Sequence, residues 1–133
     1  MMRAPQFRYH AARSVKDAVA ALADGGPGAM LLAGGTDLVP NMKRRQQVPD
    51  LVIGIRGVSR LRRITNGNGL ELGACATLTD VAEHGKVRKG YAALAKAAGS
   101  VATPLLRNMG TLGGNLCLDT RCNYYNQNHE WRQ

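Results

Sequence analysis

Two short glycine-rich stretches, each next to an apolar run, constrain the fold of this chain more than any other feature. In the first, Leu31 to Leu38 (LLAGGTDL), an apolar strand enters a Gly-Gly turn that opens a helix. In the second, Thr111 to Asn115 (TLGGN) precedes the apolar residues Leu116 to Leu118, which we interpret as a strand beside a glycine loop. Glycine lets the backbone approach a ligand closely, and free N–H groups at a helix start favour phosphate. The pair therefore predicts one extended diphosphate ligand held between two subdomains.

Either stretch by itself is a weak signal, because many Gly-Gly-Thr turns only cap helices. The first stretch lacks the Gly-Lys-Ser/Thr ending of a Walker loop, and it does not have the G-x-G-x-x-G spacing of Rossmann dinucleotide sites. These two classes of nucleotide-binding protein are excluded.

The first 56 or so residues are expected to form a compact β-α-β-α-β unit. Ser14 is a suitable cap for a helix that reaches Ala23, and Asp17 stands at the third helical position, as in a capping box. Thr36 can cap a second helix that begins at Asp37. Strands are predicted over Phe7 to His10, Ala29 to Leu32 and Asp50 to Ile55.

The second half of the chain differs in kind. A strand from Arg62, an Asn-Gly-Asn-Gly turn at residues 66–69 and a strand from Leu70 to Ala76 indicate a hairpin. Thr79 is a plausible cap for a short helix to His84, and an alanine-rich helix is expected from residue 91 to residue 98. After Asp119 the chain becomes polar, and we expect it to stop at Gln133 before the domain is closed.

The formal net charge of +9 raises nucleic acid and anionic membranes as possible partners. The basic residues fall in short scattered groups at 43–45, 56–63 and 86–89, without an RNA-binding aromatic signature or zinc-finger spacing. No stretch approaches the ~20 apolar residues of a membrane helix, and the amino terminus lacks a signal-peptide core. We therefore expect no nucleic-acid partner, no membrane partner and a cytoplasmic location.

The titratable side chains do not form a catalytic constellation. Three cysteines without a secretory signal argue against a disulfide framework, and Cys75 and Cys117 are interpreted as small buried apolar residues. His10, His84 and His129 stand in unrelated contexts without an obvious acidic partner and are expected at the surface. No catalytic residue is predicted, which suits a protein whose cofactor carries the chemistry.

Three ordered stretches resemble the flavin subunits of xanthine dehydrogenase, carbon monoxide dehydrogenase and their relatives, the molybdenum hydroxylase family. They are AGGTDLVPNMKRR from Ala33 to Arg45, GACATL from Gly73 to Leu78, and TPLLRNMGTLGGNL from Thr103 to Leu116. The resemblance implies an α+β, two-subdomain FAD-binding fold of the PCMH/VAO-like type, incomplete at its carboxy terminus. We expect the subdomains to be residues 1–57 and 58–133, with FAD in the crevice between them.

The same resemblance implies which residues touch FAD, and it names three groups. Those of the first loop are Ala33, Gly34, Gly35, Thr36 and Asp37, with Lys43 on the following helix as a further candidate whose alternative is a solvated helix face. Those of the middle segment are Ala74 and Thr77, and those of the second loop are Thr111, Gly113, Gly114 and Asn115, supported by Arg107 and Asn108.

The stretch from Leu116 to Trp131 looks like the corresponding region of the 4-hydroxybenzoyl-CoA reductase flavin subunit, where an inserted loop carries a 4Fe–4S cluster. Carried over by position, Cys122 would be the first cluster thiolate. Such a cluster ordinarily needs four thiolates, and no cysteine follows Cys122. We therefore expect no cluster in this chain, although a full-length parent could hold one.

For such a parent, the resemblance implies an electron-transfer subunit that works with a molybdopterin-binding large subunit and a 2Fe–2S small subunit. A purine or carbon monoxide dehydrogenase relative is an alternative to an aryl-CoA reductase. A second alternative is a non-enzymatic remnant or interaction fragment that binds no flavin and uses its positive charge to bind an acidic partner. A third is a flavin enzyme of similar fold that acts on a cell-wall nucleotide sugar.

Overall fold

The computed structural model describes residues 2–118 and 129–133. Cys122, the candidate cluster ligand, lies outside the described residues, and so does most of the stretch that resembles the aryl-CoA reductase.

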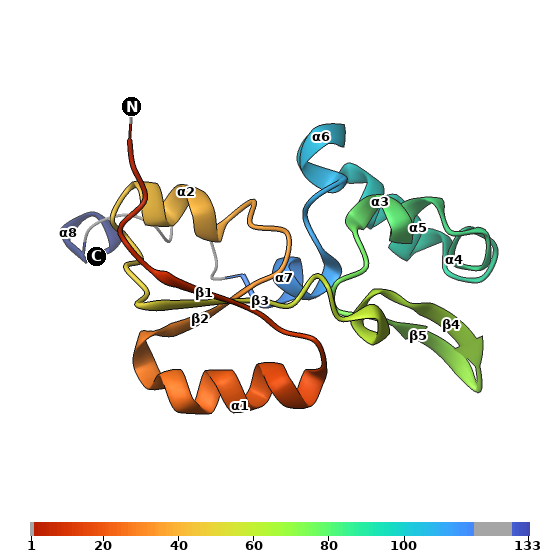
Figure 1. The fold of residues 1–133 in the computed structure, drawn as a ribbon. Coiled ribbons are helices and arrows are strands. Elements are labelled where there is room, and N and C mark those ends of the chain that lie inside the picture. The colour runs from red at the N-terminus through yellow and green to blue at the C-terminus, as the bar shows by residue number, and fades with distance from the viewer. Residues whose placement is uncertain (1, 119–128) are drawn as a thin grey trace.

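The amino-terminal part is the expected β-α-β-α-β unit (Figure 1). The three strands are parallel and β3 lies in the centre, so the sheet order is β1-β3-β2. A 3-10 turn, η1 (Gly26–Gly28), leads from the first helix into β2. The five main elements are β1 (Arg8–Ala11), α1 (Val15–Gly25), β2 (Ala29–Leu32), α2 (Leu38–Lys43) and β3 (Leu51–Gly54).

One helix covers each face of this sheet, with α1 on one side and α2 on the other (Figure 1). Neighbouring residues of a strand point to opposite faces. Ile53 therefore packs with Ala12, Ala18 and Val58 in the cluster that includes α1. Val52 packs with Leu38 and Met42 of α2. Two small cores result, and β3 is common to both of them.

The start of α1 confirms Ser14 as its cap but not the capping box. The Ser14 hydroxyl accepts a hydrogen bond from the Asp17 N–H at 3.0 Å. The Asp17 carboxylate turns away, because it accepts from the Arg13 N–H at 2.7 Å and is paired with His10 Nε2 at 2.9 Å. These two partners hold the pKa of Asp17 below its ordinary value, and the Arg13 N–H has the larger effect. His10 thus has an acidic partner, contrary to expectation.

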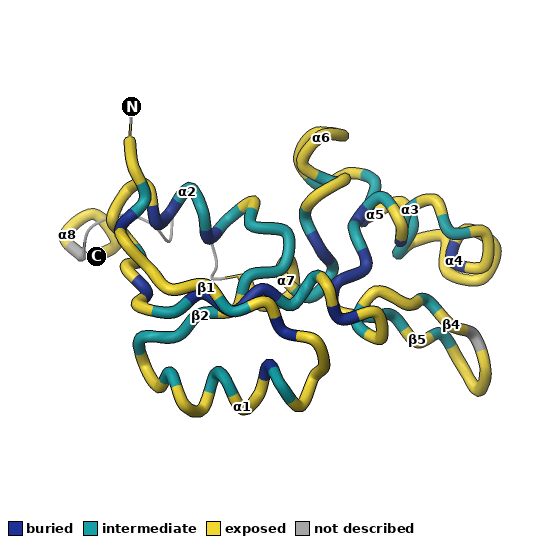
Figure 2. Tube along the Cα trace, in the orientation of Figure 1, coloured by how far each residue is buried: buried dark blue, intermediate teal, exposed yellow. Residues whose placement is uncertain are grey.

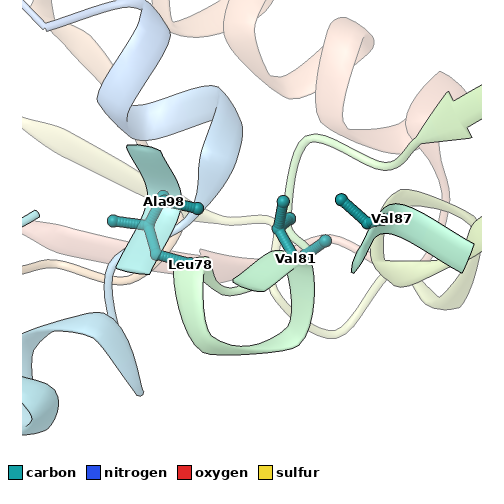
Figure 3. Close-up of a cluster of buried hydrophobic side chains, with 5 residues drawn as sticks. Leu78, Val81, Val87 and Ala98 are labelled. Carbon is teal, nitrogen blue, oxygen red and sulfur yellow. The ribbon is translucent and has the colours of Figure 1, made fainter. Parts of the chain in front are cut away.

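The second part consists of a hairpin and short helices around a core of its own (Figures 1 and 2). Its centre is Val81 and Val87, which are fully buried, with Leu78 and Ala98 beside them (Figure 3). The elements are η2 (Ser59–Arg62), the antiparallel pair β4 (Ile64–Gly67) and β5 (Gly69–Leu72), α3 (Leu78–Glu83), α4 (Gly85–Gly90), α5 (Ala92–Ser100), α6 (Pro104–Arg107) and α7 (Leu112–Leu116). A last turn, α8 (His129–Arg132), lies near the carboxy terminus.

Two sequence-based assignments in this part are wrong. Thr77, not Thr79, caps α3, because Thr77 and Asp80 exchange hydrogen bonds in a complete capping box. Residues 112–116 form the helix α7, so the strand expected over Leu116 to Leu118 is not present. A short apolar run does not distinguish a strand from a helical turn.

Smaller differences concern where elements end and how far side chains are exposed. Strand β5 stops at Leu72 instead of Ala76, and α5 runs through Gly99 to Ser100. His84 is half-buried instead of lying at the surface, and its Nδ1 is buried. No helix within residues 2–118 and 129–133 is both long enough and apolar enough to cross a membrane.

Candidate functional site

The first glycine loop leaves the sheet at the carboxyl ends of two neighbouring strands. Leu32, the last residue of β2, is paired with Gly54, the last residue of β3. The pairing continues for one step, because the Ile55 N–H donates to the Leu32 carbonyl at 2.9 Å. Ligands of α/β sheets commonly bind just beyond the carboxyl ends of the strands. The loop over residues 33–37 stands at this edge.

Gly34 brings the first loop against a segment more than seventy residues further along the chain. A Cβ built on Gly34 would overlap the backbone carbonyl of Met109 and lie 3.1 Å from the Gly110 Cα. A Cβ on Gly110 would lie 3.5 Å from the Thr36 hydroxyl. The absence of a side chain at Gly34 therefore allows two backbone segments to touch.

The middle segment joins the second glycine stretch through backbone hydrogen bonds. Thr77 and Thr111 form an antiparallel bridge, with the Leu78 N–H donating to the Gly110 carbonyl at 3.0 Å. Next to it, Gly113 lies so close to Ala74 that a Cβ on Gly113 would be 2.8 Å from the Ala74 Cβ. The fold thus brings together all three stretches that the sequence singled out.

The two glycine stretches differ in the hydrogen bonds that they can offer to a ligand. Within the described residues, the N–H groups of Gly34, Gly35 and Thr36 donate to no protein acceptor. Gly35 has a φ of 74°, a left-handed conformation that suits glycine. The first loop therefore presents three consecutive free donors, as a phosphate-binding turn requires.

In the second stretch the N–H groups of residues 112–115 are occupied. Leu112 donates to the Ala76 carbonyl and Gly113 donates to the Ala74 carbonyl, both at 2.8 Å. The Gly114 N–H donates to the Thr111 hydroxyl at 3.2 Å, which caps α7. The second stretch is therefore a packed helix start and not a glycine loop at the end of a strand. Its glycines allow close approach of the chain to itself.

Asp37 is held by a buried amide that the sequence reasoning missed. Asn41, which is 5% exposed, donates from Nδ2 to Asp37 Oδ2 at 3.0 Å. Its Oδ1 is buried and has no protein partner among the described residues. The i, i+4 spacing of the Asp37 carboxylate, at the cap of α2, and the Asn41 amide, within α2, could have predicted this contact from the sequence.

Arg107 and Asn108 support the second stretch from its amino-terminal side. Arg107 Nη1 donates to the carbonyls of Val101 and Ala102 at 2.8 and 3.0 Å, and Ala102 has a left-handed φ of 46°. Asn108 Oδ1 accepts from the Thr79 hydroxyl at 2.7 Å, which ties this segment to α3. Both side chains shape the approach of the chain toward Thr111.

The remaining candidate residues differ in their exposure and in their distance from the first glycine loop. Ala33 is half-buried, whereas Ala74, Gly114 and Asn115 are exposed. Lys43 is exposed at the last position of α2, while the glycine loop precedes the first position of that helix. The helix therefore separates Lys43 from the loop by roughly 9 Å along its axis.

Cys75 lies within the middle segment and is closed to solvent. It is 2% exposed, and its thiol donates to the Ile55 carbonyl at 3.7 Å. Burial raises the pKa of the Cys75 thiol, although Arg56 and Arg62 act in the opposite direction. Cys117 is exposed, so its interpretation as a buried apolar residue is wrong.

We expect this difference to appear in alkylation rates. The thiolate is the reactive form, so the buried Cys75 with its raised pKa should be modified at least about tenfold more slowly than Cys117 at neutral pH. Iodoacetamide labelling followed by peptide mass spectrometry measures each site separately. Labelling in denaturant, where both rates should become similar, is the control. Equal rates in the native chain would contradict the burial of Cys75.

No group of three His, Cys, Asp or Glu side chains within residues 2–118 and 129–133 is placed to hold a metal ion. A shallow pocket of about 310 Å³ lies between α3, α5 and α6, with Thr79, Arg107 and Asn108 among its lining residues.

Comparison with known proteins gives one consistent family. The family described as "FAD binding domain in molybdopterin dehydrogenase" matches residues 5–126. The chain is 40% identical over 100 residues to the FAD-binding subunit of an aldehyde oxidoreductase from Escherichia coli K12, which covers 74% of this chain and 31% of that subunit. It is 41% identical over 113 residues to the carbon monoxide dehydrogenase medium chain of Hydrogenophaga pseudoflava, covering 84% and 39%.

The solved structure of the Hydrogenophaga pseudoflava carbon monoxide dehydrogenase has the same fold. It aligns with a TM-score of 0.83 at 40% identity and covers 86% of this chain and 40% of that one. The likeness confirms the predicted α+β class. The chain spans 31% to 40% of the length of these relatives.

Proposed function

Because the chain belongs to the family of FAD-binding domains of molybdopterin dehydrogenases, we propose that it binds FAD where its three converging stretches meet. In this arrangement the N–H groups of Gly34, Gly35 and Thr36 would donate hydrogen bonds to the diphosphate of FAD. The boundary that we expected near residue 57 would place the first loop in one subdomain and the second glycine stretch in the other, on the two sides of the flavin site.

One observation carries this proposal, namely the three consecutive N–H groups of the first loop that donate to no acceptor among the described residues. A diphosphate presents several acceptor oxygens and a negative charge, which match such a turn. The residues present therefore fit the group that the family implies.

The other candidate residues are proposed to line or shape the site. Ala33 and Asp37 flank the free donors, and Asn41 orients the Asp37 carboxylate. Ala74 and Thr77 border the site from the middle segment. Thr111, Gly113, Gly114 and Asn115 border it from α7, with Arg107 and Asn108 holding that segment in place. Lys43, at the far end of α2, is a further candidate whose alternative is a solvated helix face.

We further propose that the chain acts as part of the flavin subunit of a molybdenum-containing oxidoreductase. Bound flavin supplies electron transfer, while this chain binds and orients it. The named relatives are the FAD-binding subunit of an aldehyde oxidoreductase and the medium chain of a carbon monoxide dehydrogenase. A molybdopterin-binding large subunit and a 2Fe–2S small subunit are the proposed partners.

Titration of the purified chain with FAD, followed by flavin fluorescence, tests the proposed function. Saturable binding that persists at high salt would support a built flavin site. No binding would favour the alternative, an interaction fragment without flavin, which predicts salt-sensitive association with an acidic partner instead.

A narrower proposal concerns the substrate class. The stretch from Leu116 to Trp131 supports a parent related to the 4-hydroxybenzoyl-CoA reductases. Reading the coding frame beyond the codon for Gln133 tests this directly. Three further cysteines within a few dozen codons would complete, with Cys122, the four thiolates that a 4Fe–4S cluster needs. An extended frame without them would reject the aryl-CoA assignment.

A further inference from the structure

Arg56 stands beside the proposed flavin loop although no sequence motif includes it. It follows β3 by two residues at the carboxyl edge of the sheet, where Gly54 is paired with Leu32 and Ile55 bonds to the Leu32 carbonyl. Leu32 in turn leads directly into Ala33 and Gly34. Residues that follow neighbouring parallel strands lie together at one edge.

The Arg56 guanidinium contacts Met109, the residue whose backbone carbonyl lies against Gly34. Its Nη1 lies 3.1 Å from Met109 Sδ, and the Met109 backbone carbonyl is the group that faces Gly34. A thioether is a weak acceptor, whereas a guanidinium carries five N–H donors. Among the described residues, Arg56 has no carboxylate partner. This half-buried cation is therefore held close to the site without being neutralised.

We propose that Arg56 is an anion-binding residue of the flavin site, whose guanidinium pairs with the diphosphate that the first loop receives. This inference rests on the proposed function. The loop N–H groups supply neutral donors, and Arg56 supplies the positive charge. Guanidinium groups bind phosphate oxygens in a two-pronged geometry, which a lysine does not reproduce. The Met109 thioether is a weak acceptor, so phosphate oxygens would displace it from the guanidinium.

The test is FAD titration of the full chain carrying Arg56→Gln, with Arg60→Gln as the matched control. Arg60 lies four residues away and is exposed, and Arg60→Gln removes the same charge. We expect the dissociation constant to rise about tenfold for R56Q and less than about twofold for R60Q. The dissociation constant of R56K should lie between those of the unaltered chain and R56Q, because lysine keeps the positive charge but loses the two-pronged geometry of the guanidinium.

A second variant separates ligand binding from a structural role of the Arg56–Met109 contact. Met109→Leu removes the sulfur acceptor at similar volume, so FAD binding should be unchanged or tighter if Arg56 acts on the ligand. Weakened binding in M109L, or equal weakening in R56Q and R60Q, would overturn the assignment. Unchanged binding in R56Q would also overturn it and leave the proposed function intact. Failure of the unaltered chain to bind FAD would reject both.

Discussion

Replacing Gly34 with valine is expected to weaken flavin binding by this chain strongly. The added Cβ would overlap the Met109 carbonyl, which is backbone and cannot turn aside as a flexible side chain can. The two segments would have to separate, and the free donors of the loop would move with them. Overpacking of this kind destabilises a protein by about 1–3 kcal/mol. Because binding requires the same close approach, we expect the affinity for FAD to fall on the order of a hundredfold.

The measurement is flavin fluorescence titration combined with thermal unfolding. Gly85→Ala is the matched control, since a Cβ at Gly85 meets nothing within 4 Å and its backbone has no positive φ. That change should leave both the affinity and the melting temperature nearly unaltered, because alanine is tolerated where the backbone conformation suits it. If G34V bound FAD as tightly as the unaltered chain, the apposition of Gly34 and Met109 would be wrong.

Replacing Ile53 with alanine is expected to lower the free energy of unfolding by about 2–5 kcal/mol. Ile53 is fully buried in β3, the central strand, and packs with Ala12, Ala18 and Val58. Truncation would leave a cavity between the sheet and α1 that small neighbours cannot fill. Single domains are stable by only about 5–15 kcal/mol, so a large part of the stability of this unit would be lost.

Urea denaturation followed by circular dichroism measures this effect. Val19→Ala provides the comparison, because Val19 lies on α1 and is 61% exposed. Its truncation should change the free energy of unfolding by no more than about 0.5 kcal/mol. Similar losses for I53A and V19A would mean that α1 does not pack on the sheet as described.

Features that depend on neighbours along the chain were largely predictable from the sequence. Strand β2 has the predicted bounds, Ser14 caps α1, and the β-α-β-α-β order holds. The cap of α3 was predictable as well, since Thr77 and Asp80 have the spacing of a capping box. Each of these features is decided by hydrogen bonds and side-chain periodicity within a few residues.

Features that depend on distant partners were not predictable in this way. From the sequence, Gly34 and Gly113 were predicted to have the same role, which is to let the backbone approach a ligand closely. In the structure, Gly34 lies against Met109, and its N–H has no acceptor within residues 2–118 and 129–133. Gly113 lies against Ala74, and its N–H donates to the Ala74 carbonyl. Arg56 was counted only among the scattered basic residues, because only the pairing of β2 with β3 brings it beside the loop.

The sequence by itself determined the family, the order of the elements and the three stretches that build the site, since residue types at short spacing carry that information. Only the tertiary structure decided which backbone donors remain open to a ligand. A donor is open when the folded chain places no acceptor against it, and the acceptors for residues 112 and 113 come from residues 76 and 74. The N–H groups of Gly34, Gly35 and Thr36 have no such acceptor among the described residues.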